Sequence, residues 1–284
     1  MLKTLLLLFI FLSMGFSKDI ISVHWNTVSF PPSLISSGAS KNQGYSDVVR
    51  NIIMEKMGSY KHNVEIGTVK LAITNLKRLQ NGCFSGLNMN EERKQFIYFS
   101  KPVIYSFPNE LTIKKSNSNK FKKYLTKTNE IDLYKLLQDD TLVFGYVDSR
   151  AYNSYVDELL VKFQDNKRIF SRKAPDLTKG LLHMLDRERI DYILEYPTMV
   201  KYNKSKYNIA TEFIQYPIKN ASDLIQVYVG CNKSEYGKKL IETMNQIILK
   251  NRDMFSIAYK KWIPSNVADR YDIAVKNKME SSIE

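Results

Sequence analysis

The feature of this sequence that most restricts its fold is an alternation of strand-like and helix-like segments, which starts again halfway along the chain. The alternating pattern at 21–25 predicts a strand, and the apolar stripe at 45–57 predicts a helix that ends at Gly58. A strand near 64–69 and a helix ending at Gly82 follow. Such an order is typical of α/β domains with parallel strands.

The second series begins after the polar run at 114–120. Its helix-like and strand-like segments cover 133–140, 141–147, 149–163, 168–171, 176–185 and 190–196. An extended run at 225–231, a helix from 236 to about 250 and an amphipathic stretch ending at 262–264 follow, and the polar residues 271–284 are expected to form a frayed C-terminal tail. With 284 residues, the chain is long enough for two such α/β units.

Residues 1–17 have the order of charge and hydrophobicity that is typical of a secretory signal peptide. Lys3 precedes an unbroken apolar run from Leu5 to Leu12, and small residues stand three and one positions before a cut after Ser17. The run is shorter than the ~20 residues that a membrane-spanning helix needs, which disfavours the alternative of a membrane anchor. We therefore expect cleavage near Ser17 and an exported, periplasmic mature protein that does not span the membrane.

Basic residues outnumber acidic ones, 42 Lys and Arg against 29 Asp and Glu, so a nucleic-acid partner has to be considered. The lysine pairs at 114–115, 122–123, 238–239 and 260–261 are scattered, and each is flanked by apolar or acidic residues. In an exported protein this pattern indicates a solvated basic surface. We expect no nucleic-acid partner.

The chain has two cysteines and three histidines, which are too few and too widely spaced for a usual zinc site. We expect no metal and no cofactor. Cys83 and Cys231 would lie in an oxidising compartment, where a pair of cysteines can form a disulfide. Two buried free thiols are the alternative, and the fold decides between them.

Several short motifs occur in a definite order between residues 18 and 265. They are Phe30-Pro31-Pro32, Gly44-Tyr45-Ser46-Asp47, Leu76 to Gly82, Asn90-Glu91-Glu92-Arg93 with Phe99-Ser100-Lys101-Pro102, Gly145, and Arg189-Ile190-Asp191. In this order they resemble the family 3 extracellular solute-binding proteins, which are type II periplasmic binding proteins that capture amino acids for ABC transporters. The cysteine pair and Glu195-Tyr196-Pro197 resemble a divergent subgroup of that family whose ligands are not generally assigned.

The resemblance implies a two-lobed type II fold, in which each lobe is a mainly parallel sheet flanked by helices and two hinge strands join the lobes. Residues 18–112 and 225–270 would form lobe 1, and residues 113–224 would form lobe 2. Cys83 and Cys231 would then share a lobe, which favours the disulfide if their Cα atoms lie within the ~4.4–6.8 Å window. The resemblance also implies a monomer, with an ABC transporter permease as its candidate partner.

By resemblance, Arg93 would hold the ligand's carboxylate, because a planar and permanently charged guanidinium can donate two hydrogen bonds to it. A surface arginine paired with a neighbouring glutamate is the alternative. Asn88 and Ser85 on the preceding strand could add polar contacts. Trp25 and Phe30 would cover the ligand's side chain, unless they belong to the core.

Two positions of the second lobe depart from the pattern of the amino-acid binders. Ser149-Arg150 stands where the family often has Gly-Thr, and a hydroxyl at a helix N-terminus still favours an anion while Arg150 adds a second positive charge. Tyr196, preceded by Glu195, stands where the family usually has an aspartate for the ligand's ammonium group. Either Glu195 takes that role or the ligand has no ammonium group.

We therefore expect an exported solute-binding protein, not an enzyme, whose lobes close by hinge motion on a small polar or anionic ligand for an ABC transporter. The alternatives are an enzyme on the same scaffold that acts on a carboxylic acid, with Glu195 and His24 as its nominated acid–base residues, and a ligand-sensing module. The GxSxG, P-loop and GxGxxG patterns are absent from the sequence, which excludes the common hydrolase, NTPase and dinucleotide classes.

Overall fold

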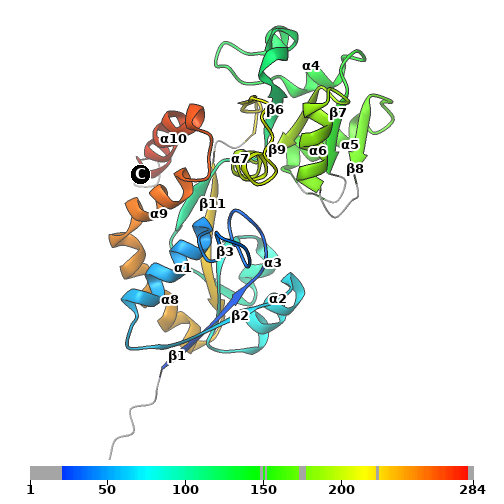
Figure 1. The fold of residues 1–284 in the computed structure, drawn as a ribbon. Helices are drawn as coiled ribbons and strands as arrows, with labels where there is room; N and C mark the ends of the chain where they lie inside the picture. The colour runs from blue at the N-terminus through cyan, green and yellow to red at the C-terminus, as the bar shows by residue number, and fades with distance from the viewer. Residues whose placement is uncertain (1–20, 148–149, 151, 173–176, 222–223, 281–284) are drawn as a thin grey trace, which may run out of the picture.

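Two β-sheets, each flanked by helices, form two lobes that two crossing segments connect (Figure 1). The computed structural model describes residues 21–147, 150, 152–172, 177–221 and 224–280. The expected signal peptide lies outside these residues. Within the described part of the chain, no helix combines the length and apolar character needed to cross a membrane. The expected α/β fold class with two lobes is confirmed.

The strands of lobe 1 are β1 (Ser22–Thr27), β2 (Lys61–Ile66), β3 (Gly82–Asn88), β4 (Ile97–Phe99), β5 (Ile104–Ser106) and β11 (Ile225–Asn232). They form one sheet in the order β2-β1-β3-β11-β4, and β5 also pairs with β11. Strand β1 is parallel to β2 and β3, as the strand–helix alternation requires. Strand β11 returns from the far end of the chain and is antiparallel to β3, β4 and β5, so the sheet is mixed.

The helices of lobe 1 are α1 (Tyr45–Lys56), α2 (Val69–Arg78), α3 (Glu91–Lys94), α8 (Glu235–Lys250), α9 (Arg252–Lys260), the 3-10 helix η2 (Ser265–Val267) and α10 (Ala268–Glu280). Helices α2 and α8 begin at hydroxyl caps, Thr68 and Ser234, whose oxygens accept backbone N–H groups of the first turn. The apolar stripe of α8 is buried against the sheet, with Leu240, Met244 and Ile248 at most 2% exposed.

Helix α10 corrects the expectation of a frayed tail from residue 271. Tyr271 and Val275 lie four residues apart on one helical face, and both are buried in the apolar core of lobe 1. Two apolar side chains among polar ones are too weak a pattern to predict a buried helix from the sequence. In the structure, these two side chains hold the helix against lobe 1.

The strands of lobe 2 are β6 (Glu110–Lys114), β7 (Phe144–Val147), β8 (Ile169–Arg172), β9 (Tyr192–Glu195) and β10 (Phe213–Tyr216). They form a sheet in the order β10-β6-β9-β7-β8, in which β7 is parallel to β8 and β9 whereas β6 is antiparallel to β9 and β10. The helices of lobe 2 are η1 (Lys115–Tyr124), α4 (Leu133–Leu137), α5 (Ser154–Lys162), α6 (Leu177–Asp186) and α7 (Pro197–Lys206).

The chain passes between the lobes twice. It leaves lobe 1 over 107–109, between β5 and β6, and returns between β10 and β11, after Ile218, which is still buried in the core of lobe 2. The first crossing therefore comes before Glu110, slightly earlier than the boundary expected at residue 112. The sequence signal for this boundary is Pro108-Asn109, which separates β5 from β6.

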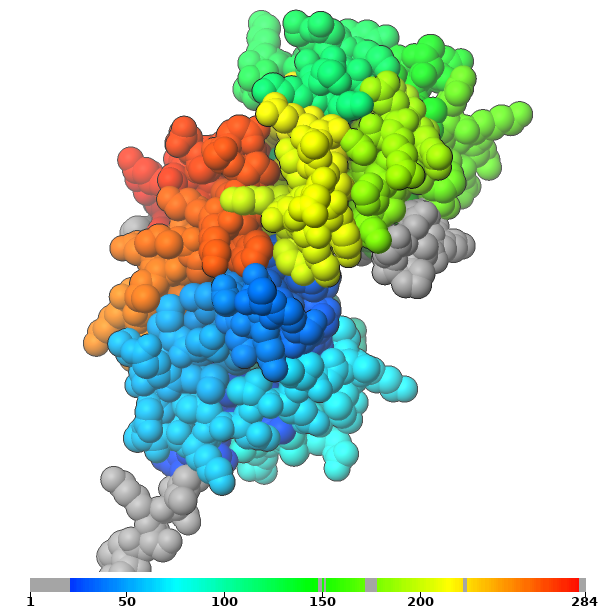
Figure 2. All heavy atoms as spheres, viewed as in Figure 1, coloured from blue at the N-terminus to red at the C-terminus, as the bar shows by residue number. Residues whose placement is uncertain are grey.

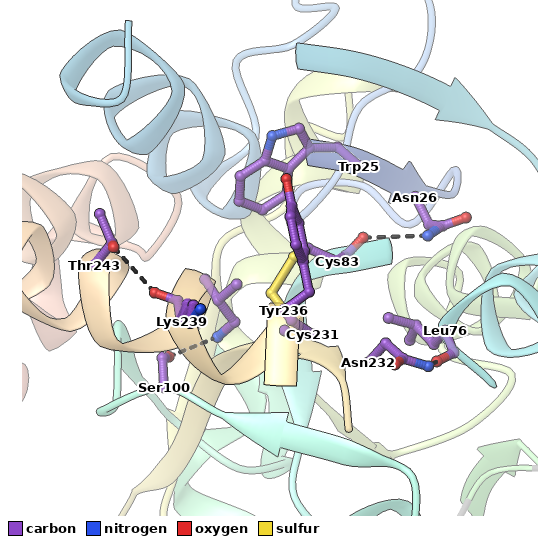
Figure 3. The surroundings of a disulfide bond; sticks show 12 residues. Trp25, Asn26, Leu76, Cys83, Ser100, Cys231, Asn232, Tyr236, Lys239 and Thr243 are labelled. Atoms are coloured by element: carbon purple, nitrogen blue, oxygen red, sulfur yellow. Dashed lines mark hydrogen bonds between the residues drawn. A yellow bond between two sulfur atoms is a disulfide. The ribbon is translucent and has the colours of Figure 1, made fainter. Parts of the chain in front are cut away.

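The expected disulfide is confirmed: Cys83 of β3 and Cys231 of β11 are bonded (Figure 3). The two residues are direct partners in the antiparallel ladder, and their Cα atoms are 4.1 Å apart. This separation is slightly below the expected window and close to the roughly 4.5 Å of non-hydrogen-bonded cross-strand pairs. The bond lies in the core of lobe 1, where both cysteines are 0% exposed.

Candidate functional site

A cavity of about 110 Å³, here called the cleft cavity, lies between the lobes next to the crossing segments. Lobe 2 contributes Tyr196, Thr198 and Met199, from the start of α7, and the first crossing contributes Phe107. The remaining lining residues belong to lobe 1: Phe30, Pro32, Ser33, Tyr45, Gly86, Asn88, Ser106, Ile225 and Val227. Both lobes therefore form the walls of this cavity, and it includes two of the expected site residues, Phe30 and Asn88.

The loop between β1 and α1 forms one wall of the cleft cavity. Phe30 and Leu34 exchange two backbone hydrogen bonds of 2.9 and 3.0 Å, which turn the loop back on itself. Phe30 is 50% exposed at this turn, so it is available to a ligand rather than packed in the core. The loop then approaches the start of α1 so closely that a Cβ at Gly44 would lie 2.3 Å from the Ser33 carbonyl oxygen, which only glycine permits.

A chain of hydroxyl groups supports the same wall from behind. The Oγ atoms of Ser33 and Ser46 are 2.8 Å apart, and Ser85 donates to the Ser46 carbonyl at 2.9 Å. Ser85 is 1% exposed, so the structure gives it a supporting place instead of the ligand contact expected from the sequence. Gly86 follows with φ +98°, and a Cβ there would meet the Ser46 hydroxyl at 2.7 Å.

Tyr45, the first residue of α1, lines the cleft cavity together with residues of both lobes. Its phenol lies near the hydroxyls of Ser33 in lobe 1 and Thr198 in lobe 2. Burial raises the pKa of Tyr45 to about 12, although the two hydroxyl contacts act in the opposite direction. The sequence placed Tyr45 only on the apolar face of a helix, and the motif Gly44-Tyr45-Ser46-Asp47 was the one signal that pointed to this position.

We expect the protein to lose stability steeply above pH 10. Burial raises the pKa of Tyr45, Tyr152, Tyr192, Tyr259 and Tyr271, so the unfolded chain releases these protons at a lower pH than the folded protein. Each contribution is fully present below pH 10 and is lost as the pH rises toward the folded value. For Tyr45 alone, the rise of the pKa from 10 to about 12 corresponds to roughly 3 kcal/mol.

Urea titrations at several pH values between 9 and 11.5, with phenolate absorbance as the second signal, would measure this loss. Tyr45→Phe should lower the number of protons released on unfolding at high pH by about one, because it removes one of the buried phenols. An unfolding free energy that stays constant from pH 9 to 11.5 would contradict the assignment.

Arg93, the expected carboxylate ligand, lies in the single-turn helix α3 and is not among the residues that line the cleft cavity. Its Nη1 donates to the Asn88 carbonyl at 2.6 Å, and Asn90 caps the turn by accepting the Arg93 backbone N–H at 2.8 Å. Glu91 pairs with Lys94 at 2.7 Å, so Arg93 has no carboxylate partner among the described residues. The guanidinium is thus partly exposed and in contact with a cavity-lining residue.

Trp25 is placed in the core of lobe 1 rather than over the cleft. It is 0% exposed, and its indole N–H donates to His62 Nδ1 at 3.1 Å. Figure 3 shows its ring beside the disulfide, in agreement with its register against Cys83. In sequence, an aromatic residue at the end of a strand fits a core position and a ligand contact equally well.

Arg150 and Glu195, two expected ligand contacts in lobe 2, bind each other. The Arg150 Nη1 and Glu195 Oε1 atoms are 2.5 Å apart, and Glu195 is 0% exposed. Thr178 donates to the other carboxylate oxygen at 2.6 Å, and the Tyr196 backbone N–H donates to Oε1 at 2.9 Å. Burial disfavours the charge of Arg150, but the Glu195 carboxylate outweighs this and raises the pKa of the guanidinium. Ser149 lies outside the described residues.

Tyr196 of lobe 2 lies beside this ion pair and also borders the cleft cavity. It precedes α7 and lines the cavity, and the Arg150 guanidinium carbon lies 5.8 Å from its ring centre. Burial raises the pKa of its phenol, while the positive charge of Arg150 acts in the opposite direction. The aspartate expected at this place is thus replaced by a neutral phenol.

Three carboxylates are buried in the described part of the chain, and an arginine pairs with each. Asp47 pairs with Arg50 at 3.0 Å, Glu110 with Arg270 at 2.7 Å, and Glu195 with Arg150 at 2.5 Å. None of the described residues that line the cleft cavity is acidic. The cavity walls are therefore aromatic, aliphatic and neutral polar, and Arg93 contacts one lining residue, at the Asn88 carbonyl.

No protein-family model matches this sequence, and no curated protein sequence matches it. Solved structures do match. Substrate-binding domain 2 of GlnP from Lactococcus lactis, in an open conformation, gives a TM-score of 0.62 at 17% identity over 87% of this chain and 96% of that one. An ancestral cationic amino acid solute-binding protein gives 0.64 at 14% identity over 87% and 97%. A histidine kinase sensor domain with similarity to periplasmic binding proteins gives 0.56 at 14% identity over 85% and 95%.

This chain has the type II periplasmic-binding-protein fold. The resemblance that the motifs indicated is confirmed at the level of fold. The two sheets, the two crossings and the cavity between the lobes are its defining parts in this chain.

In this type II fold, helix α7 of lobe 2 forms a second contact with lobe 1, away from the cleft cavity. Lys201 donates to the Ile263 carbonyl at 2.8 Å, and the rings of Tyr202 and Trp262 are 5.9 Å apart. Figure 2 shows the yellow α7 against the blue loop at 29–40 and the orange end of α9. A groove of about 460 Å³ between these segments is lined mainly by loop residues and by Tyr202, Lys206 and Trp262. The two lobes are therefore in direct contact on two sides of α7.

Proposed function

We propose that this protein is an exported solute-binding protein that captures a small polar or anionic ligand between its lobes for an ABC transporter. The observation that carries the proposal is a cavity at the crossing segments whose walls come from both lobes. At about 110 Å³ it is smaller than the roughly 300–1,000 Å³ of usual ligand sites, so we expect the lobes to open and close around the ligand. The matched domain of GlnP is named as a substrate-binding domain in an open conformation, which supports this mechanism.

The residues of the cleft favour a ligand that has a carboxylate or neutral polar groups. They do not favour a ligand whose binding depends on a contact with its ammonium group. Arg93 is the arginine near the cavity without an acidic partner among the described residues, whereas Glu195 is held by Arg150. A bound ammonium group would need an acceptor of opposite charge once it is desolvated. Phe30 and Tyr45 offer rings to an apolar part of the ligand.

The geometry gives no support to the alternative of an enzyme with Glu195 and His24 as its acid–base pair. His24 lies on β1 in lobe 1 and contacts Glu65 at 2.8 Å, whereas Glu195 lies on β9 in lobe 2 and contacts Arg150. Neither side chain lines the cleft cavity. We therefore propose binding rather than catalysis.

A thermal-shift screen of the mature protein would test the proposal with ligand pairs that differ only in an amino group, such as succinate with aspartate and glutarate with glutamate. We expect a saturable shift, and the compound without the amino group should bind at least as tightly. Arg93→Ala should weaken binding by roughly tenfold to a hundredfold, the usual value of a hydrogen bond to a charged group.

Lys94→Ala is the matched control, because it removes a positive charge from the same turn while its side chain pairs with Glu91. Equal affinities of the wild type and Arg93→Ala would reject the site but not the function. A consistent preference for the amino acids would reject the ligand class. No hit in a broad panel would favour a sensing role, since a sensor domain shares this fold.

A further inference from the structure

Glu110 occupies the point where the chain enters lobe 2. It is the first residue of β6, directly after the crossing at 107–109, and it is 1% exposed. Its neighbour across the ladder is Glu195, which Arg150 already neutralises. A buried carboxylate in this position needs a counter-charge of its own.

That counter-charge comes from helix α10 of lobe 1. Arg270 donates through Nη1 and Nη2 to the two carboxylate oxygens of Glu110, at 2.7 and 2.8 Å. This bidentate geometry is the strongest and most directional form of an ion pair. Burial raises the pKa of Glu110 and Arg270 acts against this, so the carboxylate depends on the arginine for its charge.

The other end of the crossing is held by the same helices. The Phe107 backbone N–H donates to the Tyr259 hydroxyl of α9 at 2.8 Å. The Arg270 guanidinium carbon lies 4.2 Å from the centre of the Phe107 ring, and Tyr271 meets that ring edge-on at 5.6 Å. Both ends of the segment that joins β5 to β6 are thus fixed to α9 and α10.

The residues around this crossing also contact the cleft cavity. Tyr259 stacks on Tyr271 at 4.9 Å and packs edge-on against Tyr45 at 5.2 Å. Tyr45 lines the cavity, as does Thr198 of lobe 2. A closely packed series of rings therefore runs from the cavity to α10.

Space for lobe movement exists on the side of the hinge where α10 lies. A cavity of about 260 Å³ separates Arg270 and Ala274 of α10 from Thr128, Glu130 and Pro217 of lobe 2. In Figure 1 the red α10 stands beside the crossing segments, next to this side of lobe 2. A tilt of lobe 2 toward α10 would have to move Glu110 relative to Arg270.

We infer that α10 is a hinge clamp: the Arg270–Glu110 pair restrains the first crossing, and the C-terminal helix thereby sets how far the lobes open. Arg270 is a positioning residue in this inference and touches no ligand. The inference goes beyond the proposed function and does not depend on it, because the hinge can be measured without any ligand.

Single-molecule energy transfer on the full mature chain tests the clamp, with dyes on unnatural amino acids at exposed Lys56 of lobe 1 and Asp165 of lobe 2. Dyes on added cysteines are avoided because of the native disulfide. Arg270→Ala should broaden the distribution of transfer efficiency or add a second population. Hydrogen exchange at residues 107–112 should become at least about tenfold faster, while β1 and β3 stay protected.

Lys260→Ala is the matched control, because it breaks the more exposed pair of Lys260 with Asp272, which also joins α9 to α10. It should change neither measurement. If Arg270→Ala fails to fold, the double variant Glu110→Gln with Arg270→Gln avoids an unpaired buried charge and should show the same broadening. A folded variant of either kind with the wild-type distribution and exchange rates would overturn the inference.

Discussion

Replacing Cys83 and Cys231 with alanine is expected to lower the free energy of unfolding by about 3–5 kcal/mol. The bond joins residues that are 148 positions apart, so its loss releases a very long loop in the unfolded chain. Alanine rather than serine is chosen because both positions are fully buried, where an unpaired hydroxyl would add its own cost. Urea titration measures the loss, and the slope against urea should rise because the unfolded chain becomes less compact.

The single variants Cys83→Ala and Cys231→Ala serve as controls for this prediction. Each one already breaks the bond, so the double variant should be little less stable than either single variant. Mass spectrometry of the unreduced wild type should show no alkylation and a mass deficit of two hydrogens. A double variant within about 1 kcal/mol of the wild type would mean that the bond adds little in solution, contrary to the chain-entropy model.

The periodicity of the sequence was sufficient for most of the fold, because burial on one face leaves a regular pattern. The helix of lobe 1 expected at 45–57 is α1, and the strand expected at 225–231 is most of β11. Helix α10 was missed because only Tyr271 and Val275 mark its buried face. The first crossing was placed too late because 105–115 was taken as one extended segment, although Pro108-Asn109 interrupts it between β5 and β6.

The site was only partly predictable, and the reason is that its decisive contacts join residues far apart in sequence. Phe30 and Asn88 reach the cleft cavity, as motif positions suggested. Arg150 and Glu195 looked like two separate ligand contacts, and nothing local shows that they bind each other across 45 positions. Tyr45 was missed for the opposite reason, since an aromatic residue on an apolar helical face is usually explained by packing alone.

The Arg150–Glu195 pair leads to the second large effect: Arg150→Ala is expected to destabilise the protein by roughly 3–5 kcal/mol. The substitution leaves the Glu195 carboxylate buried with only the Thr178 hydroxyl and the Tyr196 backbone N–H as donors. These neutral donors cannot replace the lost positive charge, so the carboxylate must be protonated or hydrated. Thermal and urea unfolding at pH 7 measure the loss.

Two further variants separate the destabilisation caused by an unpaired buried charge from the general effect of removing a cation. Arg150→Met combined with Glu195→Gln removes both charges and should recover most of the stability, because no unpaired ion remains in the lobe. Lys115→Ala breaks the exposed pair with Glu212, which has a similar length of 2.7 Å, and should cost less than about 1 kcal/mol. If Arg150→Ala were as mild as Lys115→Ala, the buried Glu195 carboxylate would not depend on the arginine, and the assignment of this ion pair as a stabilising contact would be wrong.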